Sequence, residues 1–270
     1  MEIGKPFKNL LAYNDSMHKS LEDKLFFTKK LPLGDYCFVD FGCADGALLR
    51  ELSKRYKKSK FIGYDISEEM LVLARKRTKK LNILFTNSWD TVEEYLRHYR
   101  KNSVLILSSV IHEVYSYATS PEDIDAFWEK VLHSGFTYIC IRDMMLTDDL
   151  NRVYREDSKD RWWACKMYGY DSKFEPYLNQ FESKYGSIYI VKNLVHFLLK
   201  YRWTINWERE LNENYFPISQ EELLEKFKDK NIIYLERFNI PYLRKCIERD
   251  WGFDMDRDTH IKLIVQPKDI

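Results

Sequence analysis

The sequence predicts an α/β fold built on a parallel, doubly wound sheet, and three observations support this prediction. Five apolar segments alternate with segments of helical periodicity between residues 36 and 143. The first apolar segment runs directly into a glycine-bearing turn, and the fourth is apolar from Val104 to Leu107. A strand covered on both faces is expected to read as a continuous apolar run. We therefore expect parallel strands joined by right-handed helical crossovers.

Residues 36–49, YCFVDFGCADGALL, predict a buried strand, a turn and the start of a helix. Asp40 stands at the expected carboxyl end of the strand, and Gly42 and Gly46 lie in the turn. Glycine lacks a Cβ atom, so it tolerates unusual dihedral angles and a close approach of the backbone to a ligand. The first amides of the helix, which begins at Ala47, point back into the turn. This junction is the expected cofactor site.

The other elements of the alternating part follow in order. A leading helix is expected over residues 15–30, because its apolar residues fall on one helical face. Ser67, in the pattern S-E-E-M, is a typical N-cap. Arg142 and Asp143 directly follow the fifth strand. Further helices are expected at 47–57, at 68–79, from about 90 to 99 and at 121–133, and further strands at 60–65, 82–86, 103–110 and 136–141.

The alternation stops after the fifth strand. Residues 147–217 show no legible order of strands and helices and are rich in tryptophan, tyrosine and phenylalanine. The pattern resumes at Ser219, where S-Q-E-E resembles a capping box. A strand from Ile232, a helix over 241–250 and a last strand over 260–265 complete the chain. The predicted division is an N-terminal helical segment at 1–35, a core at 36–146 and 218–270, and a mainly helical, aromatic-rich insertion at 147–217.

The stretch VDFGCADG, with an acidic residue at the end of the following strand, resembles the cofactor site of class I S-adenosylmethionine-dependent methyltransferases. The family motif alternates an acidic residue and three glycines with single intervening residues. Asp40, Gly42 and Gly46 match it, and Ala44 stands at the middle glycine, which leaves less room for the methionine part of the cofactor. The resemblance covers about 36–143 and 219–266. It implies a Rossmann-like seven-stranded class I methyltransferase sheet with an antiparallel last strand, into which the aromatic-rich insertion is placed after the fifth strand.

The resemblance also implies S-adenosyl-L-methionine as the cofactor. Asp65 would then hold the two ribose hydroxyls, since a carboxylate offers two acceptors to a diol. Asp40 would orient the turn and reach the ammonium of the methionine part. The adenine edge would be held by a polar residue after the third strand, which leaves Asn87, Ser88 and Trp89 open. The remaining implied cofactor contacts are Gly42, Cys43, Ala44, Gly46, Ile66, Met70 and Ser108, of which Ile66 and Met70 would pack on the adenine and Cys43 would fill space beside the turn.

Two other interpretations of the turn compete with this one. A nicotinamide or flavin dinucleotide fold also has a strand-to-helix junction followed by an acidic residue. It requires G-x-G-x-x-G, however, whereas three residues separate Gly42 from Gly46 here. Asp40 would also repel a pyrophosphate, while a positively charged sulfonium tolerates it. A turn that merely closes a structural βαβ unit is the other interpretation, and Asp65 opposes it.

The end of the fourth strand carries the candidate catalytic residues His112 and Glu113, within SSVIHEVYSY. Ligands of open parallel sheets lie beyond the carboxyl ends of the strands. Either residue could act as a general base that deprotonates a hydroxyl or ring nitrogen of the acceptor. His112 could equally cap or pack on the following helix. Methyl transfer needs little acid or base help, since positioning of the nucleophile, carbon and sulfur in line supplies much of the barrier reduction. The segment lacks N-P-P-Y and D-P-P-Y, which disfavours methylation of exocyclic amino groups of bases.

Acceptor contacts are expected from the two regions that flank this site. In many related enzymes a leading helix covers the cofactor as a lid, and Tyr13, Met17, Asp23 and Lys24 are the residues to test there. In the insertion, cations alternate with aromatic residues, and Trp162, Trp163, Arg202 and Trp203 are the candidates. Such residues can hold a nucleic acid, line a pocket for a flat small molecule, or form the core of the insertion itself. Glutamates near these cations reduce the local positive charge, which disfavours binding of a nucleic acid by electrostatic attraction alone.

Composition limits the remaining possibilities. The chain has 270 residues, with 43 basic and 42 acidic ones and a net charge of +1, so no global field favours nucleic acid or an anionic membrane. Its five cysteines lack C-x-x-C spacing, which favours free thiols and a cytoplasmic location. No metal is expected, and no apolar run is long enough to span a bilayer. The predicted function is methyl transfer from S-adenosylmethionine to a small or nucleotide-like acceptor. An RNA or DNA methyltransferase and a non-catalytic cofactor-binding module are the alternatives.

Overall fold

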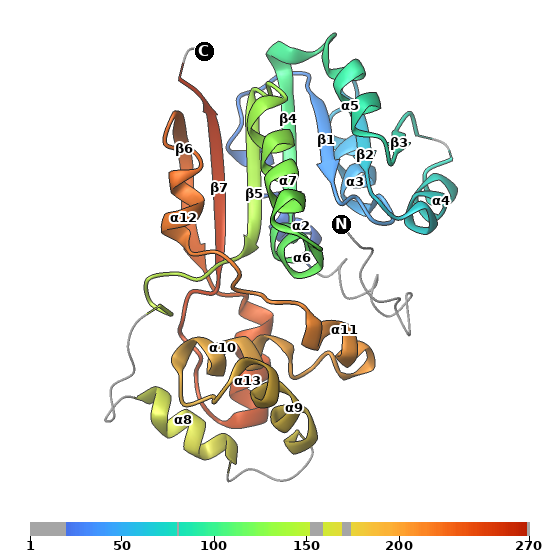
Figure 1. Ribbon diagram of the computed structural model, residues 1–270. Helices are drawn as coiled ribbons and strands as arrows, with labels where there is room; N and C mark the ends of the chain where they lie inside the picture. The colour runs from blue at the N-terminus through green and yellow to red at the C-terminus, as the bar shows by residue number, and fades with distance from the viewer. Residues whose placement is uncertain (1–19, 80, 152–158, 169–173, 269–270) are drawn as a thin grey trace.

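The computed structural model describes residues 20–79, 81–151, 159–168 and 174–268. Its centre is a seven-stranded sheet with the order β3-β2-β1-β4-β5-β7-β6 (Figure 1). Strands β1 to β5 are parallel, and β7 runs antiparallel to both β5 and β6. This arrangement confirms the predicted sheet and its antiparallel last strand. The strands are β1 (Cys37–Phe41), β2 (Lys60–Tyr64), β3 (Leu84–Thr86), β4 (Ser103–Ser108), β5 (Tyr138–Met144), β6 (Lys230–Phe238) and β7 (His260–Pro267).

The sheet is covered on both faces, which is why β1 and β4 are buried along almost their whole length. On one face lie the short helices α2 (Leu21–Lys24) and η1 (Phe26–Lys29), with α3 (Ala47–Arg55) and α4 (Glu68–Arg77). On the other lie α5 (Trp89–Leu96), α6 (Ile111–Tyr117), α7 (Pro121–His133) and α12 (Gln220–Glu225). Their apolar sides form two separate cores against the sheet. The turn η2 (Arg100–Asn102) leads into β4.

The predicted helix starts agree with the capping chemistry of the sequence. Ser67 accepts a hydrogen bond from the Met70 amide and caps α4. Ser219 and Glu222 form the predicted capping box of α12, in which each side chain bonds the backbone of the other residue. Helix α3 starts at Ala47, directly after the glycine turn. Only residues 20–30 of the expected leading helix are described, and they form α2 and η1 rather than one continuous helix.

Several boundaries differ from the sequence prediction. Strand β1 continues to Phe41, so Asp40 lies inside the strand, in register with Gly63 and Ile106. Strand β3 is shorter than expected, and β5 is shifted to 138–144, which brings Asp143 into the strand. Helix α6 was not predicted. It begins at Ile111 because the Asp143 carboxylate, more than thirty residues later, accepts hydrogen bonds from the first amides.

The insertion forms a helical subdomain beyond the carboxyl ends of the parallel strands (Figure 1). It contains α8 (Lys159–Tyr168), α9 (Glu175–Tyr185), α10 (Val191–Lys200), η3 (Thr204–Asn206) and α11 (Trp207–Asn212). Helix α13 (Pro241–Trp251), which connects β6 to β7, packs into the same core through Leu243, Ile247 and Trp251. The packing unit is therefore larger than residues 147–217. No described helix is both long and apolar enough to cross a membrane.

The insertion leaves and rejoins the core at one place. Leu146 and Ser219 form a parallel bridge, in which the Gln220 amide donates to the Leu146 carbonyl at 3.0 Å. The two ends of the helical subdomain are thereby held side by side beside the last residues of β5.

Candidate active site

The turn after β1 has the backbone conformation that the glycines were expected to provide. Gly42 and Gly46 have φ values of 75° and 73°, and Ala44 is also left-handed at 46°. A Cβ atom on Gly42 would lie 2.9 Å from Val110 Cγ2, so the turn packs directly against the start of α6. One on Gly46 would lie 2.8 Å from Phe85 Cζ. Neither position accepts a larger residue without movement of its neighbours.

Asp65 links the two turns at the edge of the sheet. Its Oδ2 accepts a hydrogen bond from the Ala44 amide at 2.8 Å, and its Oδ1 accepts one from the Ser67 amide at 2.9 Å. Burial raises the pKa of Asp65, and these two backbone hydrogen bonds oppose that rise. Each carboxylate oxygen has a further lone pair. The side chain can therefore hold the turn and accept hydrogen bonds from a diol at the same time.

Asp40 is a buried carboxylate that accepts no side-chain hydrogen bond from the described residues, although it is only 4% exposed. Burial raises its pKa to about 7, and the charge of nearby Lys24 acts in the opposite direction. A buried carboxylate without a donor is expensive unless a ligand supplies one. This position fits an ammonium group.

The other implied cofactor contacts divide into packed and accessible side chains. Ser88 caps α5 through the Thr91 amide, and Trp89 is buried against Phe41 and Tyr64. Asn87 is exposed, which leaves it as the best placed of the three to reach an adenine edge. Ile66 is half-buried, Met70 is buried, Cys43 is buried against the backbone of β2, and Ser108 Oγ is buried without a partner among the described residues.

His112 lies in the first turn of α6, beside the carboxyl ends of β4 and β5. Its Nδ1 lies 2.6 Å from Asp143 Oδ1. Asp143 Oδ2 accepts hydrogen bonds from the Val110 and Ile111 amides at 2.9 and 2.7 Å, so one carboxylate fixes both the helix start and the ring. Burial lowers the pKa of His112, but the charge and hydrogen bond of Asp143, together with the charges of Glu213 and Glu113, outweigh burial and hold the pKa above its ordinary value. The ring is thus both packed on the helix and held by a carboxylate.

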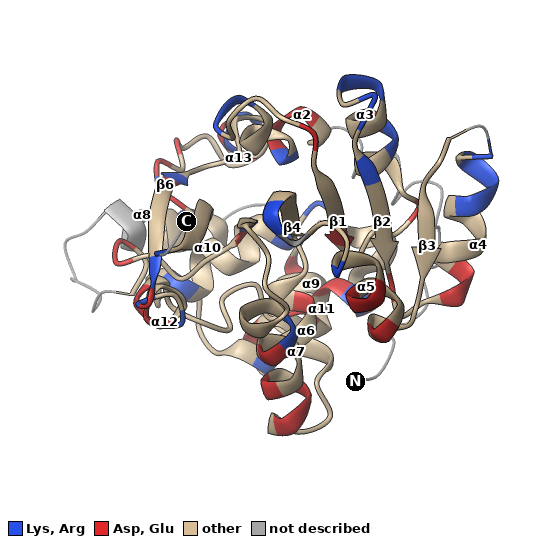
Figure 2. Cartoon of the chain, turned by 90° about the horizontal axis from the view of Figure 1, so that it is seen from above, with Lys and Arg blue, Asp and Glu red and all other residues tan. Residues whose placement is uncertain are grey.

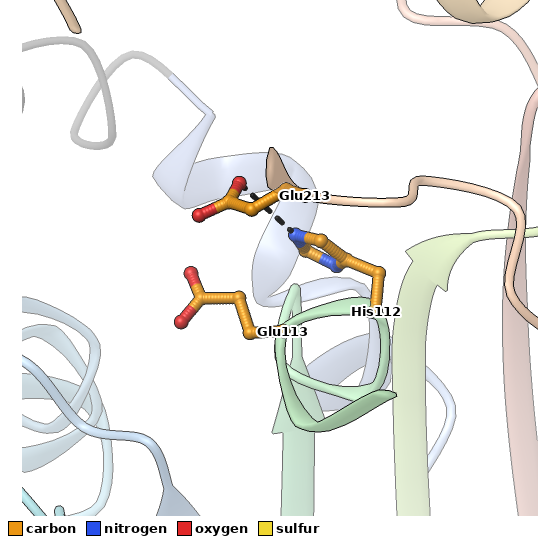
Figure 3. A group of neighbouring side chains, drawn as sticks. All are labelled: His112, Glu113 and Glu213. Atoms are coloured by element: carbon orange, nitrogen blue, oxygen red, sulfur yellow. Dashed lines mark ion pairs between the residues drawn. The ribbon is translucent and has the colours of Figure 1, made fainter. Parts of the chain in front are cut away.

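The helical subdomain places Glu213 opposite the other ring nitrogen. His112 Nε2 lies 3.9 Å from Glu213 Oε2. Figure 3 shows His112 and Glu113 on α6, with Glu213 reaching toward them from the segment after α11. Tyr117 donates its hydroxyl hydrogen to Glu213 Oε1 at 3.2 Å. The site is therefore assembled from the core and the insertion together.

Arg209 connects the two glutamates. Its Nη2 lies 3.2 Å from Glu113 Oε2, and its Nε lies 2.9 Å from Glu213 Oε1. Burial and the charge of Glu213 raise the pKa of Glu113 to about 7. His112, Glu113 and Glu213 each offer one possible metal-ligating atom within 4.8 Å of the others. Because Arg209 already pairs with both carboxylates, we assign these residues no metal.

Sequence reasoning finds His112 and Glu113 but not their partners. In the sequence, Asp143 is notable only as the end of a strand. Glu213 is one of the glutamates near the cations of the insertion, and Arg209 is not singled out by any pattern. The spacing of Arg209 and Glu213 is typical of an ion pair on one helix face. Nothing in the sequence relates that pair to His112, about a hundred residues earlier.

The candidate acceptor residues do not come together. Tyr13 and Met17 lie outside the described residues. Trp162 is 54% exposed and Trp163 only 4%, stacked on Phe253. Trp203 donates its indole N–H to the Leu199 carbonyl. Arg202 pairs with Asp250 and lines a cavity of about 530 Å³ inside the helical subdomain, whose lining does not include His112 or the glycine turn.

Charge is mixed over the molecular surface. Figure 2 shows basic residues on α3 and on one end of α4, and acidic residues on the other end of α4 and on α7. The overall net charge of +1 agrees with this mixture.

The comparison with protein families agrees with this geometry. Residues 39–134 match the model of a methyltransferase domain. About a third of this chain is therefore similar to a methyltransferase domain. The matched segment spans the glycine turn, Asp65 and His112, and it ends before Asp143 and the insertion. The sequence resemblance implies S-adenosyl-L-methionine as the cofactor, and the glycine turn, Asp65 and the buried Asp40 fit that molecule.

Solved structures similar to this chain have low sequence identity to it. The plantazolicin methyltransferase BpumL, in complex with SAH, is 11% identical over 95% of this chain and 88% of its own, with a TM-score of 0.49. A SAM-dependent methyltransferase from Anabaena variabilis is 13% identical over 98% and 88%, with a TM-score of 0.48. One from Mesorhizobium loti is 14% identical over 89% and 95%, with a TM-score of 0.49. No curated protein matches the sequence.

Proposed function

We propose that the protein transfers the methyl group of S-adenosylmethionine to a hydroxyl or ring nitrogen of a small or nucleotide-like acceptor, with His112 as the general base. The observation that carries this proposal is the Asp143–His112 contact of 2.6 Å. It lies at the start of α6, which packs against the glycine turn through Val110 and Gly42. A general base is thereby fixed next to the cofactor-binding turn.

The bound cofactor supplies an electrophilic methyl group on a positively charged sulfur. Gly42 and Gly46 would let the backbone approach the cofactor, Asp65 would hold the ribose hydroxyls, and Asp40 would face the ammonium. Ile66 and Met70 would pack on the adenine, and Asn87 would hold its edge. The positions of the side chains and the family resemblance support these proposed roles.

The hydrogen bond to Asp143 fixes the orientation of the His112 ring and determines which ring nitrogen carries the proton. With Nδ1–H donated to Asp143, the neutral ring presents Nε2 as a proton acceptor. A hydroxyl or ring N–H of the acceptor that faces Nε2 would donate its proton there, while the acceptor atom takes the methyl group and the methyl–sulfur bond breaks to leave S-adenosylhomocysteine. Glu213 then stabilises the imidazolium that forms, because its carboxylate faces the same nitrogen. Arg209 keeps both glutamates in place.

The acceptor is proposed to lie between the carboxyl edge of the sheet and α11, where Glu113 and Glu213 meet His112. A small or nucleotide-like molecule is favoured over RNA or DNA. The surface charge is mixed, and the cations and aromatic residues expected to hold a nucleic acid are separated. Trp163 is buried, and Arg202 is paired with Asp250.

The test is to incubate the full chain with methyl-labelled S-adenosylmethionine and fractionated cell extract. We expect label in the small-molecule fraction, and at least about 100-fold less label with His112→Ala. The matched control is His133→Ala, an exposed histidine at the end of α7, which should label normally. Label confined to RNA, DNA or protein contradicts the proposed acceptor class, and equal labelling by His112→Ala contradicts the proposed base.

A further inference from the structure

One face of the sheet carries a row of charged and polar side chains at its carboxyl edge. Asp40 is in register with Ile106, and Ile106 with Cys140. Two residues further on, Ser108 is in register with Arg142. Because side chains alternate between faces along a strand, Asp40, Ser108 and Arg142 point to the same face. This is the face covered by α2.

Lys24, the last residue of α2, is buried over this row. It is 7% exposed, and its ammonium forms no hydrogen bond or ion pair with any described residue. Burial, together with the charge of Arg142, lowers the pKa of Lys24 to about 8, against the opposing effect of the charges of Asp40, Glu113 and Asp143. The pKa of Lys24 is therefore influenced by charged residues on both faces of the sheet at the carboxyl end of β4.

Arg142 is the second buried cation of the row, at 3% exposure. Its Nε donates to Asp23 Oδ2 at 2.9 Å, and its Nη1 to Ser109 Oγ at 3.0 Å. Its Nη2 is buried and has no partner in the described part of the chain, and the same holds for Ser108 Oγ. Ser109 has a φ of 58°, so the backbone at the end of β4 is held in the left-handed region.

These features have complementary charges. Among the described residues, Arg142 Nη2 and Ser108 Oγ are buried without a hydrogen-bond partner, and no side chain donates a hydrogen bond to the buried Asp40. Lys24 and Asp40 are close enough to shift each other's pKa, yet they form no ion pair. Buried polar groups in native proteins are nearly always satisfied, which points to a ligand bearing both a cationic and an anionic group. An α-amino acid zwitterion is such a ligand.

We propose that Lys24 and Arg142 bind the carboxylate of the methionine part of the cofactor, while Asp40 faces its ammonium. This inference rests on the proposed function, which requires S-adenosylmethionine to bind here. Ser108 Oγ, between β1 and β5 in the row, donates to the same carboxylate. The short helix α2 then completes the cofactor site by supplying a charge.

The test compares two ligands by calorimetric titration of the full chain: S-adenosylmethionine and decarboxylated S-adenosylmethionine, which lacks only the carboxylate. The wild type should bind the first about 10–100-fold more tightly, because a charge-assisted contact to a buried cation is lost with the second. This comparison needs no variant and so does not depend on the folding of a mutant.

The variants are Lys24→Met and Arg142→Met, with Lys29→Met on η1 as the matched control, since that lysine is exposed. Lys24→Met should weaken binding of S-adenosylmethionine about 10-fold or more and leave binding of decarboxylated S-adenosylmethionine nearly unaffected. The effects of the substitution and of removing the ligand carboxylate should therefore not be additive. Arg142→Met should act in the same direction, and Lys29→Met should resemble the wild type.

The outcomes separate this inference from the proposed function. If the wild type binds neither ligand, the proposed cofactor and this inference both fail. If it binds both ligands equally, or if Lys24→Met weakens both to the same extent, only the carboxylate assignment is overturned. Unchanged binding of S-adenosylmethionine by Lys24→Met and Arg142→Met would likewise overturn it, and would leave these cations to an anionic group of the acceptor.

Discussion

His112 and Asp40 are both buried, but their surroundings differ in a way that suits different tasks. The His112 ring has a carboxylate on each side, at 2.6 Å and 3.9 Å. The Asp40 carboxylate accepts no side-chain hydrogen bond within the described residues. The surroundings of His112 suit its proposed role of accepting a proton. Those of Asp40 suit its proposed role of facing the ammonium of the cofactor.

The rate of methyl transfer should depend on pH through His112. Only the neutral ring accepts a proton, so kcat/KM should rise as pH passes the pKa of His112, which lies above the ordinary 6.5. Asp143→Asn removes the charge that raises this pKa. The rise should then move to lower pH, and the plateau should fall about 10-fold or more as the ring loses its orientation.

The measurement is the pH profile of kcat/KM with the acceptor identified by labelling. Glu129→Gln, which alters an exposed partner of His133 on α7, is the matched control. A profile that keeps its midpoint in Asp143→Asn would show that the titration belongs to another group, with Glu113 the first candidate.

Substitution of Gly42 should destabilise the protein more than its left-handed backbone conformation alone would predict. Gly42→Ala forces alanine into the left-handed region, and it also brings Cβ within 2.9 Å of Val110 Cγ2. Gly135 has nearly the same φ, 74°, but has nothing within 4 Å of the added atom. Gly135→Ala should therefore cost about 1 kcal/mol of stability, and Gly42→Ala about 1–3 kcal/mol more.

Denaturation in urea measures both free energies of unfolding. Val110→Ala in the Gly42→Ala background should recover part of the loss, because it removes the opposing methyl groups. Equal losses for the two glycines would mean that the turn moves away from α6 at little cost.

Among the elements, those with local signals were predictable and those set by distant residues were not. The strands β1, β2 and β4 are marked by apolar runs, and α4 and α12 by their serine caps. Helix α6 lacks a side-chain cap of its own, since its first amides bond to Asp143. The starts of α3 and α13 were also clear, from the glycine turn and from Pro241 at the first helical turn.

The capping box of α12 should stabilise the core measurably. Ser219→Ala removes the acceptor for the Glu222 amide and should lower the free energy of unfolding by about 1 kcal/mol. Ser120→Ala is the matched control, because Ser120 stands at the N-cap of α7 but forms no side-chain bond to the helix amides. It should change stability by less than about 0.5 kcal/mol.

Thermal and urea unfolding of both variants provide the comparison. If Ser120→Ala were as destabilising as Ser219→Ala, the loss would reflect serine removal at a helix start in general rather than the reciprocal bonds of the capping box.

On the scale of the whole molecule, the site depends on contacts that no local pattern encodes. Sequence reasoning proposes the cofactor turn, Asp65, His112 and Glu113 as site residues, because these follow strands whose order the family resemblance implies. It could not locate Glu213 and Arg209, which reach α6 only through the folding of the helical subdomain. It also left α13 with the core, although its apolar face packs with the insertion.

The insertion should therefore contribute to methyl transfer without contributing to cofactor binding. Glu213→Gln removes the negative charge that faces His112 Nε2 and pairs with Arg209. We expect kcat/KM for the acceptor to fall about 10-fold or more, with an unchanged Kd for S-adenosylmethionine. Glu208→Gln changes an exposed glutamate on the same helix and should leave both quantities unchanged.

Enzyme assay and calorimetry on the same preparations separate the two effects. A parallel loss of cofactor affinity in Glu213→Gln would mean that the helical subdomain shapes the cofactor site as well as the acceptor site.

The bridge between Leu146 and Ser219 suggests how this architecture limits modular exchange. A segment whose ends lie side by side can in principle be excised and replaced by a short linker, as in a domain graft. Here such a graft would expose the apolar face of α13, because its residues Leu243, Ile247 and Trp251 pack against the segment removed. Recombination that brings new acceptor specificity to this scaffold must therefore exchange α13 together with residues 147–217.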